Sequence, residues 1–159
     1  MVKYPIVFEE TLNEDEFDDL ENQFDFPEWR LSDSFWHIPN LYLYRQSFKC
    51  KMLAQRAIQK ELCENGWYVK GQTYGLEDSF HSDDCDFTFY LFSCGSWNKH
   101  WGGDLIIENK SRRNKWERYE YMPNRSVLFP AHWLHCSSAP NRYCHKLRTS
   151  VTFKFSLRG

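Results

Sequence analysis

The sequence lacks several features that would place it at once in a class of proteins. No apolar run approaches the roughly 20 residues of a membrane-spanning helix, and the first residues have no long apolar core of a secretory signal. We therefore expect a cytoplasmic protein without a membrane partner. The net charge is only −2, so the overall charge does not favour nucleic acid as a partner.

The six cysteines contain no Cys-x-x-Cys pair. Together with the missing signal, this favours free thiols in a reducing compartment over a disulfide scaffold. A zinc site built from Cys85, Cys94, Cys136 and Cys144 remains an alternative, although their spacing matches no common zinc motif.

What is present indicates a single ordered domain over residues 1–159. The chain is 42% hydrophobic and 18% aromatic, which is too apolar for disorder, and its length suffices for a proper core. No internal repeat or low-complexity linker divides it. The oligomeric state is left open.

Two helices are predicted in the first part of the chain. Asn13 and Glu16 form a capping-box pattern at the start of the first helix, and Phe17, Leu20 and Phe24 then recur at helical spacing. The second helix is predicted over residues 46–64 and should end at Asn65-Gly66. Residues 1–66 are thus expected to be mainly helical support, and residues 67–159 to form a β core.

The rest of the chain is rich in aromatic and β-branched residues separated by short turn signals. No long helix lies between these runs, which excludes a parallel sheet of β-α-β units and favours an antiparallel sandwich or jelly roll. The fold class is therefore mostly β, of the α+β type, with the N-terminal helices packed on one sheet. The predicted strands cover residues 67–76, 86–94, 103–109, 118–123, 126–131 and 148–157.

The last predicted strand alternates between two faces. Val151, Phe153, Phe155 and Leu157 share an apolar face that can pack on the helices, whereas Arg148, Ser150 and Thr152 share the other. An arginine buried on that second face needs a partner. The partner could be a carboxylate of the protein or the carboxylate of a bound small molecule, which arginine binds with two parallel hydrogen bonds.

The triplet His81-Ser82-Asp83 could supply two metal ligands, because residues two apart in an extended segment share a face. About one His-x-acid match is expected by chance in a chain of this composition, so a third ligand is needed. His132, His135 and His145 are the candidates. Two histidines and one carboxylate occupy one face of an octahedron and suit non-haem iron.

The order of these features resembles the Fe(II)- and 2-oxoglutarate-dependent dioxygenases, in particular the prolyl-4-hydroxylase-like branch. The features are Q-x-Y at 72–74, H-x-D at 81–83, "TFYL" at 88–91, "WGGDL" at 101–105, "LFPAHWLH" at 128–135, "AP" at 139–140 and "RTSVTF" at 148–153. The resemblance covers about residues 67–157 by motif and implies a double-stranded β-helix.

The resemblance also implies roles for individual residues. His81, Asp83 and His135 would bind Fe(II), and Arg148 would bind the far carboxylate of the cosubstrate 2-oxoglutarate. O2 is the other cosubstrate, and ascorbate could support turnover. The implied reaction hydroxylates an unactivated C–H bond and releases succinate. The remaining predicted cosubstrate-binding residues are Tyr74, Thr88, Tyr90 and Ser150.

Some choices remain open at the level of sequence. The long interval between His135 and Arg148 leaves Arg142 and Lys146 as alternative cosubstrate ligands. The expected substrate is a prolyl or other residue of a peptide or protein, with a free amino acid or small molecule as the alternative. A non-catalytic cupin-like binding module is a second hypothesis. The basic run at 110–118 is expected to be a solvated loop, with a substrate-contacting loop as the alternative.

Overall fold

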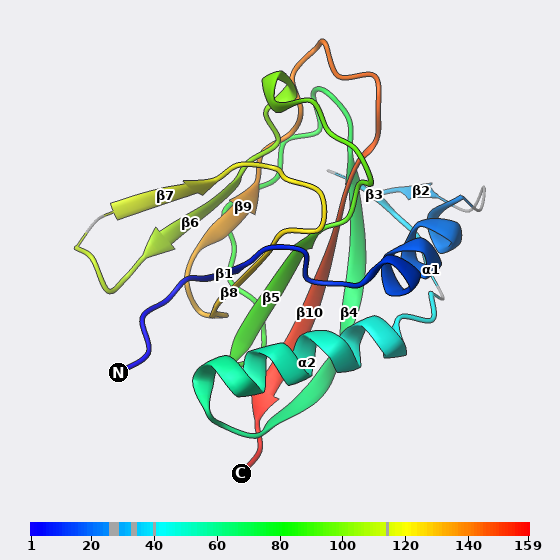
Figure 1. Ribbon diagram of the computed structural model, residues 1–159. Coiled ribbons are helices and arrows are strands. Elements are labelled where there is room, and N and C mark those ends of the chain that lie inside the picture. Colours follow the sequence, from blue (N-terminus) through cyan, green and yellow to red (C-terminus); the bar gives the residue numbers. More distant parts are fainter. Residues whose placement is uncertain (26–28, 33–34, 40, 114) are drawn as a thin grey trace.

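The computed structural model describes residues 1–25, 29–32, 35–39, 41–113 and 115–159. Within these residues the chain forms two antiparallel sheets and two α-helices (Figure 1). The larger sheet has the strand order β1-β8-β5-β10-β4-β3-β2, and the smaller has the order β7-β6-β9. The prediction of a mostly β jelly roll with N-terminal helices is confirmed. The elements are β1 (Ile6–Phe8), α1 (Glu14–Phe24), β2 (Arg30–Leu31), β3 (Trp36–His37), α2 (Tyr44–Ile58), β4 (Leu62–Gln72), β5 (Phe87–Phe92), the 3-10 turn η1 (Lys99–Trp101), β6 (Leu105–Asn109), β7 (Lys115–Tyr119), β8 (Ser126–Pro130), β9 (His135–Ser137) and β10 (Arg148–Leu157).

Helix α1 begins at the predicted capping box. The Asn13 side chain accepts a hydrogen bond from the backbone N–H of Glu16 at 2.8 Å, and the Glu16 carboxylate accepts one from the Asn13 N–H at 2.8 Å. Both bonds satisfy N–H groups that the first helical turn would otherwise leave free. Leu20 is fully buried and anchors the helix on the sheet.

Helix α2 ends earlier than the sequence predicts. It stops at Ile58, and Gln59 adopts the left-handed conformation with φ 55° while its N–H bonds to the carbonyl of Gln55. Asn65 and Gly66, the predicted stop, instead lie inside β4. The register between β4 and β10 shifts there, and Gly66 has φ +94°, a conformation that glycine adopts at a β-bulge.

The change from helices to strands does not fall at Gly66, where the sequence placed it. Strand β4 already begins at Leu62, and the short strands β1, β2 and β3 belong to the larger sheet although they precede it in sequence. Residues 1–66 therefore contribute three complete strands as well as both helices. Strands this short carry too few residues to show an alternating pattern.

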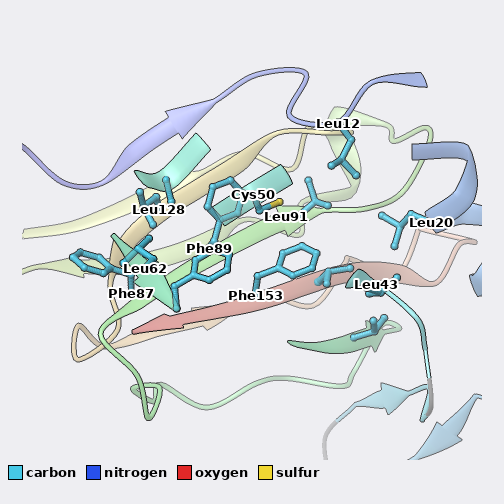
Figure 2. Packing of buried hydrophobic residues seen from close by; sticks show 14 of the residues in the cluster. Leu12, Leu20, Leu43, Cys50, Leu62, Phe87, Phe89, Leu91, Leu128 and Phe153 are labelled. Carbon is cyan, nitrogen blue, oxygen red and sulfur yellow. The ribbon is translucent and has the colours of Figure 1, made fainter. Parts of the chain in front are cut away.

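The helices pack on one face of the larger sheet (Figure 1). Figure 2 shows this core, in which Phe89 and Phe153 of the central strands lie beside Cys50 and Leu20 of the helices. As the alternation of β10 predicts, Val151, Phe153 and Phe155 all point into this core; only Leu157, at the strand end, remains 41% exposed.

The smaller sheet faces the other side of the larger one. Leu105 and Ile107 of β6 are fully buried there against Val127 and Phe129 of β8. The polar residues of β10 and β4 are enclosed on this side. Within the part of the chain that the structure describes, no helix is long and apolar enough to span a membrane.

Part of the basic run at 110–118 differs from a simple loop. Residues 110–113 form the turn after β6, whereas residues 115–118 belong to β7, which pairs with β6 from Leu105↔Tyr119 to Asn109↔Lys115. Asn114 lies outside the described residues. Lys110, Arg112, Arg113 and Lys115 are exposed, which agrees with a solvated hairpin tip.

Candidate metal centre and adjoining cationic pocket

His81 and His135 lie side by side because the segment before β5 pairs with β9. The two residues exchange backbone hydrogen bonds, from His81 N–H to His135 O at 3.0 Å and from His135 N–H to His81 O at 2.9 Å. Asp83 is fixed two residues later by its N–H bond to the Ala131 carbonyl at 2.9 Å. The strand parity then directs all three side chains to one place.

The three predicted ligands converge as the sequence implied. One donor atom of each of His81, Asp83 and His135 lies within 4.8 Å of the others. The His135 Nε2 atom is 3.2 Å from Asp83 Oδ2, and the His81 Nε2 atom is 3.9 Å from Asp83 Oδ1. Among the described residues, this is the one group of three or more His, Cys, Asp or Glu side chains that could hold a metal ion.

Both imidazoles are oriented by backbone carbonyls. The His81 Nδ1 atom is 2.9 Å from the Ser79 carbonyl, and the His135 Nδ1 atom is 2.9 Å from the Trp133 carbonyl. Each Nδ1 therefore carries the proton and donates it, which leaves each Nε2 as a lone pair directed at the shared position. This is the usual outer arrangement of metal-binding histidines.

The Asp83 carboxylate is held in its charged form. Burial raises its pKa, but the adjacent imidazoles of His135 and His81 and the hydrogen bond from the Thr88 hydroxyl outweigh burial and lower the pKa to about 2. The Thr88 Oγ1 atom donates to Asp83 Oδ2 at 2.6 Å. The group is thus ionised and oriented at neutral pH, as a metal ligand must be.

Arg148 is the largest fully buried side chain, with 0% exposure. Its Nε donates to the Gly103 carbonyl at 2.9 Å, and its Nη1 donates to Gln72 Oε1 at 3.2 Å and to the Tyr90 hydroxyl at 3.0 Å. Gly103 has φ +84°, and a Cβ at this position would lie only 3.0 Å from Arg148 Nε. A glycine is therefore required where the guanidinium passes.

The guanidinium retains one nitrogen without a hydrogen-bond partner and is surrounded by aromatic rings. Its carbon lies 5.1 Å from the ring centre of Tyr121 and 5.8 Å from that of Phe92. Within the described chain, Arg148 Nη2 and the buried Ser150 hydroxyl have no hydrogen-bond partner, and no carboxylate lies within 4.0 Å of Arg148. Such groups are costly unless a ligand satisfies them.

The other predicted cosubstrate ligands divide between this pocket and the surface. Tyr90 is 3% exposed and its hydroxyl accepts a hydrogen bond from Arg148, so the structure places it beside the predicted cosubstrate-binding arginine. Thr88 faces the same interior but supports Asp83 instead. Tyr74 lies in the turn after β4 and is 66% exposed, so the structure does not bring it to the pocket. Strand β4 ends at Gln72, and Gln72 occupies the inward position.

The alternatives that the sequence left open lie away from the site. His132 is exposed in the turn before β9, and His145 is exposed and packs edge-on against Trp101. Arg142 is exposed beside Tyr143, and Lys146 bonds to Ser96. Among the candidates for the third metal ligand, His135 is the buried one. Among the candidates for the cosubstrate-binding cation, Arg148 is the buried one.

The cysteine alternative does not form. All six cysteines are free, and within the described ranges Cys85, Cys94, Cys136 and Cys144 do not assemble as a metal-binding group. Burial raises the pKa of the Cys136 thiol to about 11, and it also raises the pKa values of Cys85 and Cys144.

Sequence reasoning missed several polar residues of the site. Lys70 and Gln72 occupy the inward face of β4, opposite Ser150 and Arg148 in the β10 register. Asp78 binds Lys70 at 2.8 Å, and Ser137 of β9 bonds to the Tyr90 hydroxyl at 2.6 Å. The sequence "WYVKGQ" contained a signal for both residues. In a strand, Tyr68, Lys70 and Gln72 lie on one face, and Trp67, Val69 and Gly71 lie on the other.

No family model matches the sequence, and no curated protein matches it. Solved structures do match the fold. A Pseudomonas putida prolyl-4-hydroxylase has a TM-score of 0.71 at 13% identity, with 98% of this chain and 93% of that chain covered. A Trichoplax adhaerens prolyl hydroxylase, solved with a peptide fragment of the oxygen degradation domain of hypoxia inducible factor, has a TM-score of 0.71 at 12% identity and covers 96% and 83%.

A third neighbour broadens the comparison. The α-ketoglutarate-dependent epimerase SnoN from nogalamycin biosynthesis has a TM-score of 0.74 at 10% identity and covers 95% of this chain and 76% of that chain. At such low identities the likeness establishes the fold, which is that of the 2-oxoglutarate and Fe(II) oxygenases.

Proposed function

We propose that this chain is an Fe(II)- and 2-oxoglutarate-dependent oxygenase. The observation that carries the proposal is the pairing of two sites on the inner side of one jelly roll. His81, Asp83 and His135 form a three-ligand group, and the buried Arg148 presents a free donor in the same interior. A facial set of two histidines and one carboxylate leaves coordination positions open for other ligands.

The donor set fits a divalent iron ion. Two neutral imidazole Nε2 atoms and one ionised carboxylate are the ligand types that non-haem Fe(II) takes, and each already has its orienting hydrogen bond. A bound iron ion would let 2-oxoglutarate and O2 supply the oxidation: 2-oxoglutarate would be decarboxylated to succinate and CO2, with one oxygen atom of O2 entering succinate and the other hydroxylating an unactivated C–H bond.

The cationic pocket fits the far carboxylate of 2-oxoglutarate. Arg148 Nη2 and the Ser150 hydroxyl are the two buried groups that lack a partner, and both belong to the inward face of β10. A carboxylate would satisfy both and would form the close ion pair that no described carboxylate forms within 4.0 Å of Arg148. Gln72 and Tyr90 already fix Nη1, so the fork is oriented before the ligand arrives.

The aromatic rings around Arg148 exclude water. Tyr90, Phe92 and Tyr121 surround the guanidinium and are each 5% exposed or less. Exclusion of water strengthens the interaction between the guanidinium and a bound carboxylate, because the effective dielectric constant is low. The protein thus binds, orients and shields the cosubstrate.

For the substrate we propose a prolyl or other residue of a peptide or protein. The support is the similarity of fold to prolyl hydroxylases, one of which was solved with a peptide. A small molecule is the alternative, since SnoN, named for nogalamycin biosynthesis, has a comparable TM-score. Ascorbate as a supporting reductant and action in the cytoplasm belong to the same proposal.

The test is a screen of peptides and free amino acids for stimulated turnover of 2-oxoglutarate by the iron-loaded protein. A hit must also gain the mass of one oxygen atom on a named residue, because uncoupled turnover consumes 2-oxoglutarate without modifying a substrate. If the pure protein binds neither Fe(II) nor 2-oxoglutarate under anaerobic conditions, the oxygenase proposal is wrong. Binding of both without any turnover under O2 would favour the cupin-like module.

A further inference from the structure

The residues that hold the metal ligands in place include a buried ion pair that the sequence analysis did not identify. We propose that Asp78, with Lys70 as its counter-ion, is a positioning residue that sets His81 relative to His135. The inference rests on the proposed metal site and concerns how this chain builds it. Three contacts of the Asp78 carboxylate support the proposal.

The first contact orients the imidazole of His81 through the backbone. Asp78 Oδ1 accepts a hydrogen bond from the Ser79 N–H at 3.0 Å. The carbonyl of the same residue, Ser79, accepts the bond from His81 Nδ1 at 2.9 Å. Asp78 therefore fixes the turn whose carbonyl determines the tautomer and direction of the His81 ring.

The second contact reaches the strand of the other histidine. Asp78 Oδ2 accepts a hydrogen bond from the Ser137 N–H at 3.2 Å, and Ser137 is two residues beyond His135 in β9. One carboxylate thus bridges the two segments that carry the imidazoles. Ser137 continues the network to the pocket, because its hydroxyl contacts the Tyr90 hydroxyl, which binds Arg148.

The third contact is the ion pair. Lys70 Nζ lies 2.8 Å from Asp78 Oδ2, and the side chains are only 4% and 7% exposed. Within the described part of the chain, Asp78 is the carboxylate within 4.0 Å of Lys70, whose ammonium also lies 4.9 Å from the Phe35 ring. The pair anchors the segment before His81 to β4, an interior strand of the larger sheet.

The pair also explains why Asp78 is not itself a metal ligand. Asp78 Oδ2 lies 3.8 Å from His81 Nδ1, so it is on the opposite side of the ring from the metal-facing Nε2. Lys70 balances the charge of the Asp78 carboxylate. The carboxylate oxygens accept from the backbone N–H groups of Ser79 and Ser137. Removing one partner of a buried pair leaves the other charge uncompensated, which is strongly destabilising.

The test measures the affinity of the protein for Mn(II), used alone as an oxygen-stable probe, from the EPR signal of the free ion. Asp78→Asn keeps the shape and one acceptor oxygen but loses the charge. We expect its Kd for Mn(II) to rise about tenfold, the lower end of the range for residues that orient metal ligands. Glu77→Gln and Asp84→Asn remove exposed carboxylates next to Asp78 and Asp83, respectively, and should change the Kd less than about twofold.

The double variant Lys70→Met/Asp78→Asn separates positioning from stability. It removes the unpaired ammonium that Asp78→Asn leaves behind, so the melting temperature should recover towards that of the wild type. The Kd for Mn(II) should stay about tenfold raised, because Ser79 and Ser137 still lack the carboxylate.

Several outcomes would overturn the inference. An Asp78→Asn protein with the wild-type Kd for Mn(II) would contradict the proposal. A Glu77→Gln protein that loses as much affinity for Mn(II) as Asp78→Asn would also contradict it. Recovery of both melting temperature and affinity in the double variant would show that Asp78 only neutralises Lys70. A wild-type protein without affinity for Mn(II) or Fe(II) would instead contradict the metal site itself and the proposed function with it.

Discussion

Arg148→Met removes the buried guanidinium and leaves an apolar side chain in the same space. The wild-type residue is fully buried, holds Gly103, Gln72 and Tyr90 through Nε and Nη1, and keeps Nη2 free. If that free donor binds 2-oxoglutarate, the substitution should weaken cosubstrate binding strongly while leaving the metal ligands of the other segments intact.

The expected loss follows from the burial of the pair. Truncating one member of a buried, hydrogen-bonded charge pair costs roughly 2–5 kcal/mol, and about 3 kcal/mol corresponds to a 100-fold weaker Kd. A ligand at 100 times its Kd stabilises the folded state by about 2.7 kcal/mol. At the same concentration, a 100-fold weaker ligand stabilises it by only about 0.4 kcal/mol.

The assay is the melting temperature of the Mn(II)-loaded protein with and without 2-oxoglutarate in the absence of oxygen. For a chain of this size, wild type should gain about 5–10 °C and Arg148→Met about 1 °C. Arg148→Lys keeps the charge but loses the planar fork, so it should lie between them. Arg142→Met changes the exposed arginine six residues earlier and serves as the control. A full shift in Arg148→Met, or a lost shift in Arg142→Met, would refute the assignment of the pocket.

Three further predictions concern single side chains. Asp83→Ala should abolish metal binding measured by EPR with Mn(II), whereas Asp84→Ala, in the exposed neighbour, should leave it unchanged; equal losses would show that the ligand is misassigned. Thr88→Val removes the 2.6 Å hydrogen bond to Asp83 and should weaken metal binding by about tenfold in the same measurement, so an unchanged Kd would mean that the hydroxyl does not orient the carboxylate. Cys136 should react with a disulfide reagent at pH 8 on the order of 100-fold more slowly than the exposed Cys63, because burial raises the pKa of the Cys136 thiol to about 11; equal labelling rates mapped by mass spectrometry would contradict the buried position.

The parts of the fold that could be predicted from the sequence are those encoded by local periodicity. The alternation in β10 placed Val151 and Phe153 in the core and Arg148 on the inner face, and the structure agrees. The Asn13 capping box likewise marks the start of α1. The end of α2 was not predictable in this way, because Asn65-Gly66 is equally suited to a helix stop and to the β-bulge that it forms.

The site was predictable where the order of motifs along the chain carried the information. His81, Asp83 and His135 belong to such motifs, whereas Lys70 and Asp78 do not. Their contact depends on the register between β4 and the turn before His81, which no local pattern specifies. Tyr74 was assigned by its match to a family motif, but β4 ends at Gln72 and Tyr74 lies exposed in the turn that follows.

Succinate formation is the measurement that tests the central claim most directly. Pure protein is supplied with Fe(II), 2-oxoglutarate and O2, and succinate is quantified for wild type, His135→Ala and Arg148→Met. The proposed function predicts slow succinate release by wild type even before a substrate is known, and release at the background rate of protein-free iron in both variants. Background succinate formation by wild type, or equal formation by all three proteins, would contradict it.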